Sequence, residues 1–212
     1  MPNKPSALLL IASGCQHCPS VLQSLSELIK EGQLSHLEVV NIVEDPERAR
    51  QLNVRSVPWV KLGEFELVGL KSKTELQQWI EKSSDPDNLA AYFEELMTSG
   101  ELSKVQQWVA DKPESIQGLF DIMTNEKSSL SARIGVGAII EALAGSELLQ
   151  SQIETLGALC QHPSAQVRND ACYYLGLSHS PQATALIRPL LKDENSDVRE
   201  SAEDALSELE NR

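Results

Sequence analysis

Two of the four cysteines, Cys15 and Cys18, are separated only by a glutamine and a histidine. A pair at this spacing can form and break a disulfide, and it can also supply half of a zinc site. The other half of a zinc site is not evident, because Cys160 and Cys172 lie far away in helical patterns and the remaining histidines have no zinc-finger spacing. Redox chemistry is therefore the favoured interpretation, with metal binding and purely structural cysteines as the alternatives.

Cys15 lies between a predicted strand and a predicted helix. The apolar run at residues 7–13 predicts a buried strand, and Pro19 fits the first turn of the helix that follows. Unpaired N–H groups and the positive end of the helix dipole favour a thiolate over a thiol at this point, and a protonated His17 would add a positive charge. Cys15 is thus the predicted nucleophile, and Cys18 the residue that resolves a mixed disulfide by intramolecular attack.

The first 82 residues alternate between extended and helical patterns. Strands are predicted at residues 7–13, 37–43, 57–62 and 65–68. The first two are expected to be buried. The first predicted helix ends at Gly32, and the second begins at Asp45-Pro46-Glu47. A third helix follows a capping box at Ser72–Glu75. The order is βαβαββα, an α/β domain.

A proline stands at the start of the third predicted strand, where it cannot donate a ladder hydrogen bond. An ordinary edge-strand proline is one explanation of Pro58. Together with the cysteine motif, however, the chain resembles the thioredoxin superfamily over residues 5–82, with a core closer to the minimal glutaredoxin size. The resemblance implies that Pro58 is cis and lies against the disulfide, and that the backbone of Val57 pairs with a substrate chain. Trp59 is a candidate border of this site, or a core residue.

The motif departs from the best-known members of the superfamily. Thioredoxins have Trp-Cys-Gly-Pro-Cys and a buried aspartate six residues before the first cysteine, whereas this chain has Gly14 and Leu9 at those places. Glutaredoxins that bind glutathione show Gly-Gly-x-Asp where this chain has residues 69–72, Gly-Leu-Lys-Ser. The position of His17 resembles the Cys-Pro-His-Cys motif of periplasmic disulfide oxidants. We predict a dithiol mechanism with no bound cofactor and no metal.

A polar segment with a proline, residues 83–87, separates this half from a helical one. We therefore predict a redox domain at residues 1–84 and a helical domain at residues 85–212. In the second domain, residues 165–175 and 196–206 share the pattern Val-Arg-x-x-Ala-x-x-x-Leu at an offset of 31 residues, and a partial copy begins at Ala132. Paired helices with a period in the thirties indicate an α-solenoid.

These copies resemble HEAT repeats of the short type found in phycobilin lyases, over about residues 128–210. The predicted core positions are Val167, Ala171, Leu175, Val198, Ala202 and Leu206. Arg168 and Arg199 occupy equivalent places and are expected to pair with acids such as Asp170 or Asp197. Solenoids expose extended faces, so recognition of a protein partner or client is expected.

The acidic charge is unevenly distributed along the chain. Residues 1–82 hold 9 basic and 10 acidic side chains, whereas residues 83–212 hold 9 and 21. Such an acidic half repels nucleic acid and suits a partner with a basic surface. A cytoplasmic protein that does not enter a membrane is expected, because no apolar run approaches the roughly 20 residues needed to span one and four cysteines are few for a secreted scaffold.

The sequence therefore predicts a thiol–disulfide oxidoreductase that acts on a protein disulfide or thiol, with the helical repeats docking the substrate or partner. The alternative is a non-catalytic adaptor, in which the thioredoxin-like domain and the HEAT-like repeats serve only protein–protein interaction. The predicted site consists of Cys15, Cys18, His17 and Pro58 as catalytic residues, with Val57 and Trp59 binding the substrate.

Overall fold

The computed structural model of the chain describes residues 4–83 and 89–210. The chain divides into two compact units, Met1–Asn88 and Leu89–Arg212, called unit 1 and unit 2 below. The predicted boundary between residues 84 and 85 lies outside the described residues and stays a prediction. Within the described ranges, no helix combines the length and the apolar character needed to cross a membrane.

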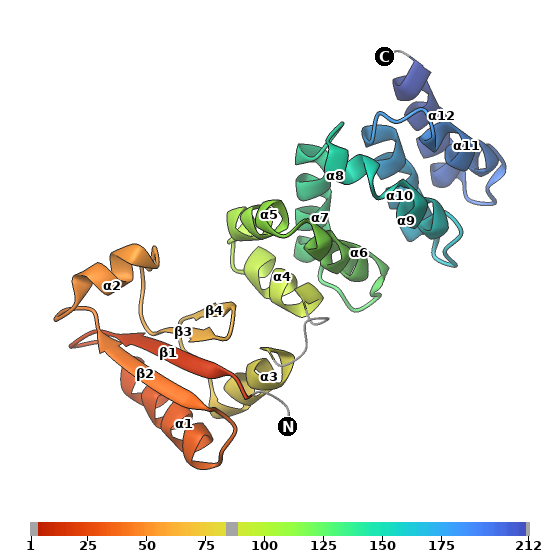
Figure 1. Cartoon of the computed structure of the whole chain (residues 1–212). Helices are drawn as coiled ribbons and strands as arrows, with labels where there is room; N and C mark the ends of the chain where they lie inside the picture. Colours follow the sequence, from red (N-terminus) through yellow and green to blue (C-terminus); the bar gives the residue numbers. More distant parts are fainter. Residues whose placement is uncertain (1–3, 84–88, 211–212) are drawn as a thin grey trace. The chain divides into compact units, whose positions relative to one another are not determined.

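Unit 1 is a four-stranded sheet with helices on both faces. Its elements are β1 (Ser6–Ile11), α1 (Cys18–Lys30), β2 (His36–Asn41), α2 (Pro46–Gln51), β3 (Trp59–Leu62), β4 (Phe65–Val68) and α3 (Lys73–Ser83). The strand order is β2-β1-β3-β4, with β1 parallel to β2 and antiparallel to β3. Figure 1 shows α1 and α3 on one face of the sheet and α2 on the other. The predicted order βαβαββα is confirmed.

Local capping and turn signals define the connections of unit 1. The Asp45 carboxylate accepts the Arg48 backbone N–H at 3.2 Å and caps α2. The Ser72 hydroxyl accepts the Glu75 N–H at 3.2 Å while the Glu75 carboxylate accepts the Ser72 N–H at 2.8 Å, which is the predicted capping box of α3. Gly63 has a φ of +58° in the two-residue β3–β4 turn, a conformation that favours glycine.

The core of unit 1 is centred on β1. Leu9 and Leu10 are both 0% exposed, one on each face of the sheet. The prediction of a second buried strand was wrong, because β2 lies at the edge of the sheet and Val39 is 40% exposed. An apolar run indicates a strand, but it does not indicate whether neighbours cover both of its faces.

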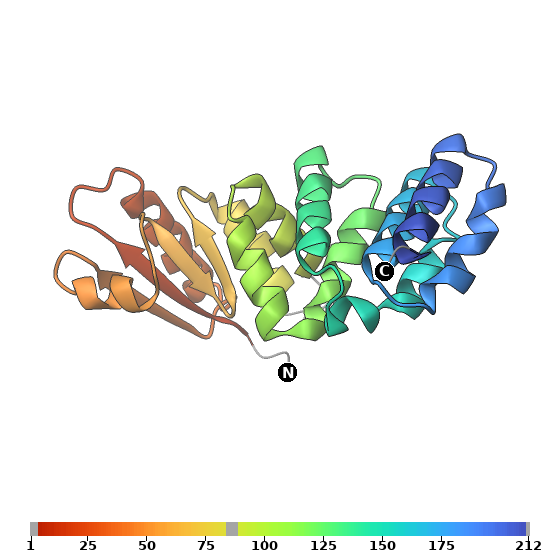
Figure 2. The same ribbon diagram turned by 90° about the horizontal axis from the view of Figure 1, so that it is seen from above.

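Unit 2 is entirely helical in its described part. Its elements are α4 (Leu89–Thr98), α5 (Leu102–Asp111), the 3₁₀ helix η2 (Pro113–Ile116), α6 (Gln117–Thr124), α7 (Leu130–Ala142), α8 (Glu147–Gln150), α9 (Ile153–Leu159), α10 (Ala165–Leu177), α11 (Ala183–Ile187), the 3₁₀ helix η3 (Arg188–Lys192) and α12 (Ser196–Glu210). Figure 2 shows these helices following one another in sequence order, from green to blue. The predicted all-α architecture is confirmed.

The three copies of the repeat motif become α7, α10 and α12, and α10 contacts both of the others. All predicted core positions but Leu206 are buried, and the equivalent positions of α7 are buried as well. They are Ala132, Val136 and Ile140 in α7, Val167, Ala171 and Leu175 in α10, and Val198 and Ala202 in α12. Leu206 is only half-buried and so departs from the predicted core.

Arg168 pairs with a different acid from those predicted. Its guanidinium donates two hydrogen bonds of 2.8 Å to the carboxylate of Asp193, which lies 25 residues away in the next repeat, rather than to Asp170 or Asp197. The two side chains are only 9% and 7% exposed. A buried, bidentate pair of this kind links consecutive repeats, because it holds the start of α10 against the loop before α12.

The repeated arginines also share a role that the sequence did not indicate. Each one donates to two main-chain carbonyl groups in the segment that precedes its own helix, which is a loop except at Met123, in the last turn of α6. These acceptors are Met123 and Asn125 for Arg133, His162 and Pro163 for Arg168, and Asp193 and Glu194 for Arg199. Since carbonyls in loops and in the last turn of a helix have no partner within a helix, these arginines supply hydrogen bonds that the helices do not.

We expect Asp193→Asn to lower the free energy of unfolding by on the order of 3 kcal/mol, because it removes the buried counter-charge of Arg168 and leaves only the exposed Glu194, at 3.5 Å. Arg168 holds the pKa of Asp193 below its ordinary value. A carboxyl with a lowered folded-state pKa stabilises the fold above its unfolded pKa of about 3.9 and loses that contribution as the pH falls through the folded pKa. Urea unfolding at several pH values measures both effects.

The matched control for this experiment is Glu203→Gln, an exposed substitution on α12 that also removes one negative charge. It should change the free energy of unfolding by less than about 0.5 kcal/mol. An Asp193→Asn variant as stable as this control, with an unchanged loss of stability below pH 4, would contradict the assigned role of the pair.

Candidate redox site

The candidate site forms where the end of β1 meets the start of β3. The antiparallel register pairs Leu10 with Trp59, so the residues that follow Leu10 lie beside those that precede Trp59. After β1, the chain reaches Cys15 through a tight turn. In it the Cys15 N–H donates to the Ala12 carbonyl at 3.2 Å, and Gly14 has a φ of +85°. The sheet register therefore positions both sides of the site.

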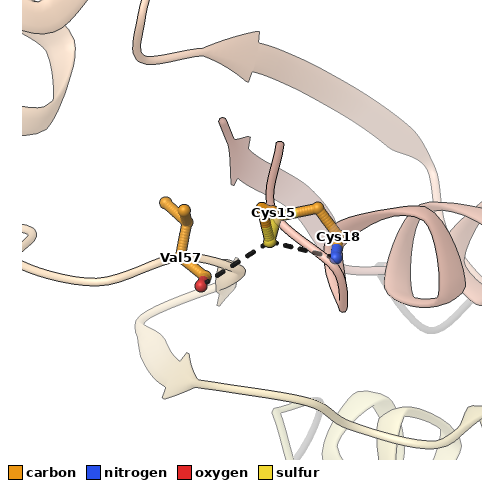
Figure 3. The surroundings of a disulfide bond; sticks show 3 residues. All are labelled: Cys15, Cys18 and Val57. Atoms are coloured by element: carbon orange, nitrogen blue, oxygen red, sulfur yellow. Dashed lines mark hydrogen bonds between the residues drawn. A yellow bond between two sulfur atoms is a disulfide. The ribbon is translucent and has the colours of Figure 1, made fainter. Parts of the chain in front are cut away.

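Cys15 and Cys18 are joined by a disulfide. α1 begins at Cys18, and the Cys18 backbone N–H lies 3.1 Å from the Cys15 sulfur. On the opposite side, the Val57 carbonyl oxygen lies 3.8 Å from the same sulfur; Figure 3 shows both contacts. A disulfide sulfur carries no hydrogen, so the second contact becomes a hydrogen bond only when Cys15 is a thiol. Cys15 thus lies between a backbone donor and a backbone acceptor.

The two sulfur-bearing residues differ in exposure. Cys18 is 3% exposed, whereas Cys15 is half-buried. A partner can therefore reach Cys15 more easily than Cys18. This difference agrees with the roles predicted for Cys15 as nucleophile and Cys18 as resolving residue.

The peptide bond between Val57 and Pro58 is cis, as the resemblance implied. Pro58 is buried, and its carbonyl accepts the Gly69 N–H at 2.9 Å. The Val57 carbonyl faces the Cys15 sulfur, and within the described residues the Val57 N–H has no hydrogen-bond partner. Val57 therefore offers a main-chain donor beside the disulfide, which is what an extended substrate chain requires for pairing.

Two other predicted site residues differ in their surroundings. Trp59 is 2% exposed, and its side chain lies in the core on the same sheet face as Leu10. We therefore withdraw Trp59 as a substrate-binding residue, because side-chain alternation along β3 directs it inward.

His17 is exposed at the N-cap of α1, and its side chain makes no capping hydrogen bond. It lies within the motif, and its electrostatic role stays a prediction.

Leu70 is a neighbour of the site that sequence reasoning did not select. It follows Gly69, which is hydrogen-bonded to Pro58, and it is 52% exposed. The β3–β4 hairpin produces this proximity, because its register pairs Trp59 with Val68. The glycine of the β3–β4 turn was recognised in the sequence as a hairpin signal. That signal predicted the turn, but it did not predict that Leu70 lies near Pro58.

The remaining cysteines have a different environment. Cys160 and Cys172 are free and buried in unit 2. Burial raises the pKa of Cys160 to about 12 and the pKa of Cys172 to about 11. Neither thiol forms appreciable thiolate near neutral pH. Among the residues that the structure describes, no group of three or more His, Cys, Asp and Glu side chains is arranged to hold a metal ion.

Comparison with known protein families agrees with this geometry. Residues 7–81 match the family model of the thioredoxin domain, and residues 116–207 match that of HEAT repeats. The chain therefore carries a thioredoxin domain with a disulfide-forming Cys-x-x-Cys pair, followed by HEAT repeats. HEAT repeats commonly mediate protein–protein interaction. No curated protein matches the chain, and α4 and α5 lie outside both matched regions.

In the reduced, folded protein we expect Cys15 to be alkylated first and Cys160 and Cys172 to remain unmodified until the protein unfolds. The reason is that only Cys15 is both accessible and close to a helix N-terminus. Brief treatment with iodoacetamide, followed by peptide mass spectrometry, measures the order of modification. A sample unfolded in urea is the control and should be modified at all four cysteines. Modification of Cys160 or Cys172 as fast as that of Cys15 would contradict the site assignment.

We also expect the pKa of Cys15 in a Cys18→Ser variant to lie below the ordinary thiol value of about 8.5, because the start of α1 stabilises negative charge. Adding His17→Gln to this variant should raise that pKa, since it removes the charge that a protonated histidine supplies. Thiolate absorbance at 240 nm as a function of pH measures both values. A Cys15→Ser/Cys18→Ser variant gives the background, and a Cys15 pKa of 8.5 or above would rule out an activated nucleophile.

Proposed function

We propose that unit 1 is a thiol–disulfide oxidoreductase acting on a protein disulfide or thiol, and that the HEAT repeats dock its substrate or partner. The observation that carries this proposal is the Cys15–Cys18 disulfide next to the cis bond before Pro58. The Val57 N–H, which has no hydrogen-bond partner among the described residues, provides a place for a substrate main chain next to a residue that contacts Cys15. From the sequence, we propose that the protein acts in the cytoplasm. We also propose that its partner has a basic surface.

In the reducing direction, the Cys15 thiolate attacks one sulfur of a substrate disulfide. A mixed disulfide forms between Cys15 and that sulfur, and the second substrate sulfur leaves as a thiolate that takes up a proton. The Cys18 thiolate then attacks the Cys15 sulfur, and the first substrate sulfur leaves and is protonated in turn. The substrate gains two electrons, and the chain ends with the Cys15–Cys18 disulfide. The oxidising direction follows the same steps in reverse.

The backbone next to Pro58 serves the first of these steps by orienting the substrate. A substrate chain that pairs with the Val57 N–H lies in an extended conformation across the site, so its disulfide is presented to Cys15. The exposed Leu70 lies close to Pro58 and contributes apolar contact to the same chain. Pairing through main-chain groups sets little requirement on the substrate sequence, so a separate docking surface is needed for selectivity.

One observation favours the alternative function, a non-catalytic adaptor. At the position of the family's buried aspartate the chain has Leu9, which is 0% exposed and cannot accept a proton from Cys18. A platform that only binds partners needs no such acceptor. The two functions differ in whether a covalent intermediate forms.

We expect Cys18→Ser to accumulate mixed disulfides with substrate proteins, because the variant can form the first bond but cannot resolve it. Incubation with a cell lysate and non-reducing electrophoresis should show species that disappear on treatment with dithiothreitol. Cys15→Ser/Cys18→Ser is the matched control and should show none. If the same partners co-purify with this control and no covalent species form with Cys18→Ser, the adaptor function is correct.

A further inference from the structure

Unit 2 carries a small group of exposed apolar side chains. The large hydrophobic residues exposed in its described part are Leu130, Ile134 and Tyr173, at 73%, 64% and 43%. Leu130 and Ile134 lie one turn apart on the same stripe of α7, and Tyr173 lies on α10, which contacts α7. Exposed large apolar residues on two helices that contact each other are candidates for an interaction site.

The repeat fold does not require large apolar residues at these places. Since α7, α10 and α12 are copies of one motif, each position has equivalents in the other two helices. The equivalents are Ala165 and Ser196 for Leu130, Asn169 and Glu200 for Ile134, and Ala138 and Asp204 for Tyr173. All six are small or polar, so the repeats pack without large apolar side chains at these positions, and the three exposed ones have another role.

Two carboxylates flank the exposed tyrosine. Glu141 lies on the same stripe of α7 as Leu130 and Ile134, and it accepts a hydrogen bond of 3.2 Å from the Tyr173 hydroxyl. Glu208 acts on Tyr173 from α12: desolvation, Glu141 and then Glu208 raise the pKa of Tyr173 above its ordinary value. The Tyr173 hydroxyl thus contacts one carboxylate on α7 and feels the negative charge of a second on α12.

We propose that Leu130, Ile134, Glu141, Tyr173 and Glu208 form a docking surface for a basic amphipathic segment of a partner protein. Apolar side chains of that segment pack on Leu130 and Ile134, and a lysine or arginine lies over the Tyr173 ring between the two carboxylates. An aromatic face beside carboxylates attracts a cation both through the ring quadrupole and through opposite charge. This inference rests on the docking part of the proposed function and needs no redox step.

The charge of the protein selects this occupant over others. Residues 83–212 carry 9 basic and 21 acidic side chains, so a nucleic acid is repelled. A second copy of the chain, with a net charge of −13, would place like charges against Glu141 and Glu208. A basic segment is attracted by the same field, and its binding should weaken as the salt concentration rises.

The test uses the full chain as its Cys15→Ser/Cys18→Ser variant, so that a failure of the redox chemistry does not affect it. A displayed library of random 12-residue peptides is selected against this protein, and the enriched peptides are synthesised with a fluorescent label. We expect enriched peptides to combine arginine or lysine with apolar residues. Fluorescence anisotropy then measures their affinity at low and high salt.

Adding Leu130→Ser with Ile134→Ser, or Glu141→Gln with Glu208→Gln, should weaken binding at least tenfold. The matched control, Glu147→Gln with Glu154→Gln, removes two exposed charges from α8 and α9 and should leave the affinity within twofold. Circular dichroism and the melting temperature verify that each variant is folded. The proposal is overturned if no peptides are enriched, if the enriched peptides are acidic or purely apolar, or if the docking variants bind like the control.

Discussion

The antiparallel pairing of β1 with β3 is the constraint on which the candidate site depends. Cys15 follows the end of β1, and Val57 precedes the start of β3, so the register of Leu10 opposite Trp59 decides whether the two meet. A slip of one residue would move every side chain of β3 to the opposite face of the sheet. Trp59 would then leave the core, and the Val57 carbonyl would no longer lie 3.8 Å from the Cys15 sulfur. Core packing and site geometry are thus set by the same pairing.

Residues of the same type have different roles in this protein, because their burial and their neighbours differ. Cys15 lies at a helix start and is accessible, whereas Cys160 has the same thiol in a core that raises its pKa to about 12. Arg168 likewise carries a charge, yet it is buried against Asp193 and loop carbonyls and so joins two repeats. The charges that can meet a partner are those on exposed faces, such as Glu141 beside Tyr173.

The sequence by itself determined the order of the elements and the residues of the redox motif. Hydrophobic periodicity distinguished strands from helices, and capping residues such as Ser72 placed helix starts, because these signals act within about four residues of the chain. The repeat of Val-Arg-x-x-Ala-x-x-x-Leu at an offset of 31 residues indicated the solenoid, because the same sequence pattern folds into the same unit each time it recurs. The cis bond at Pro58 followed from the resemblance to the thioredoxin superfamily rather than from any local pattern.

Only the tertiary structure decided which residues meet across the chain. It placed β2 at the sheet edge, turned Trp59 inward and brought Leu70 close to Pro58. It also paired Arg168 with Asp193 instead of an acid on its own or the next helix. Each of these outcomes depends on strand order, register or repeat stacking, which join residues that are distant in the sequence. A pattern read over one or two turns of chain carries no information about such neighbours, since many folds present the same local pattern.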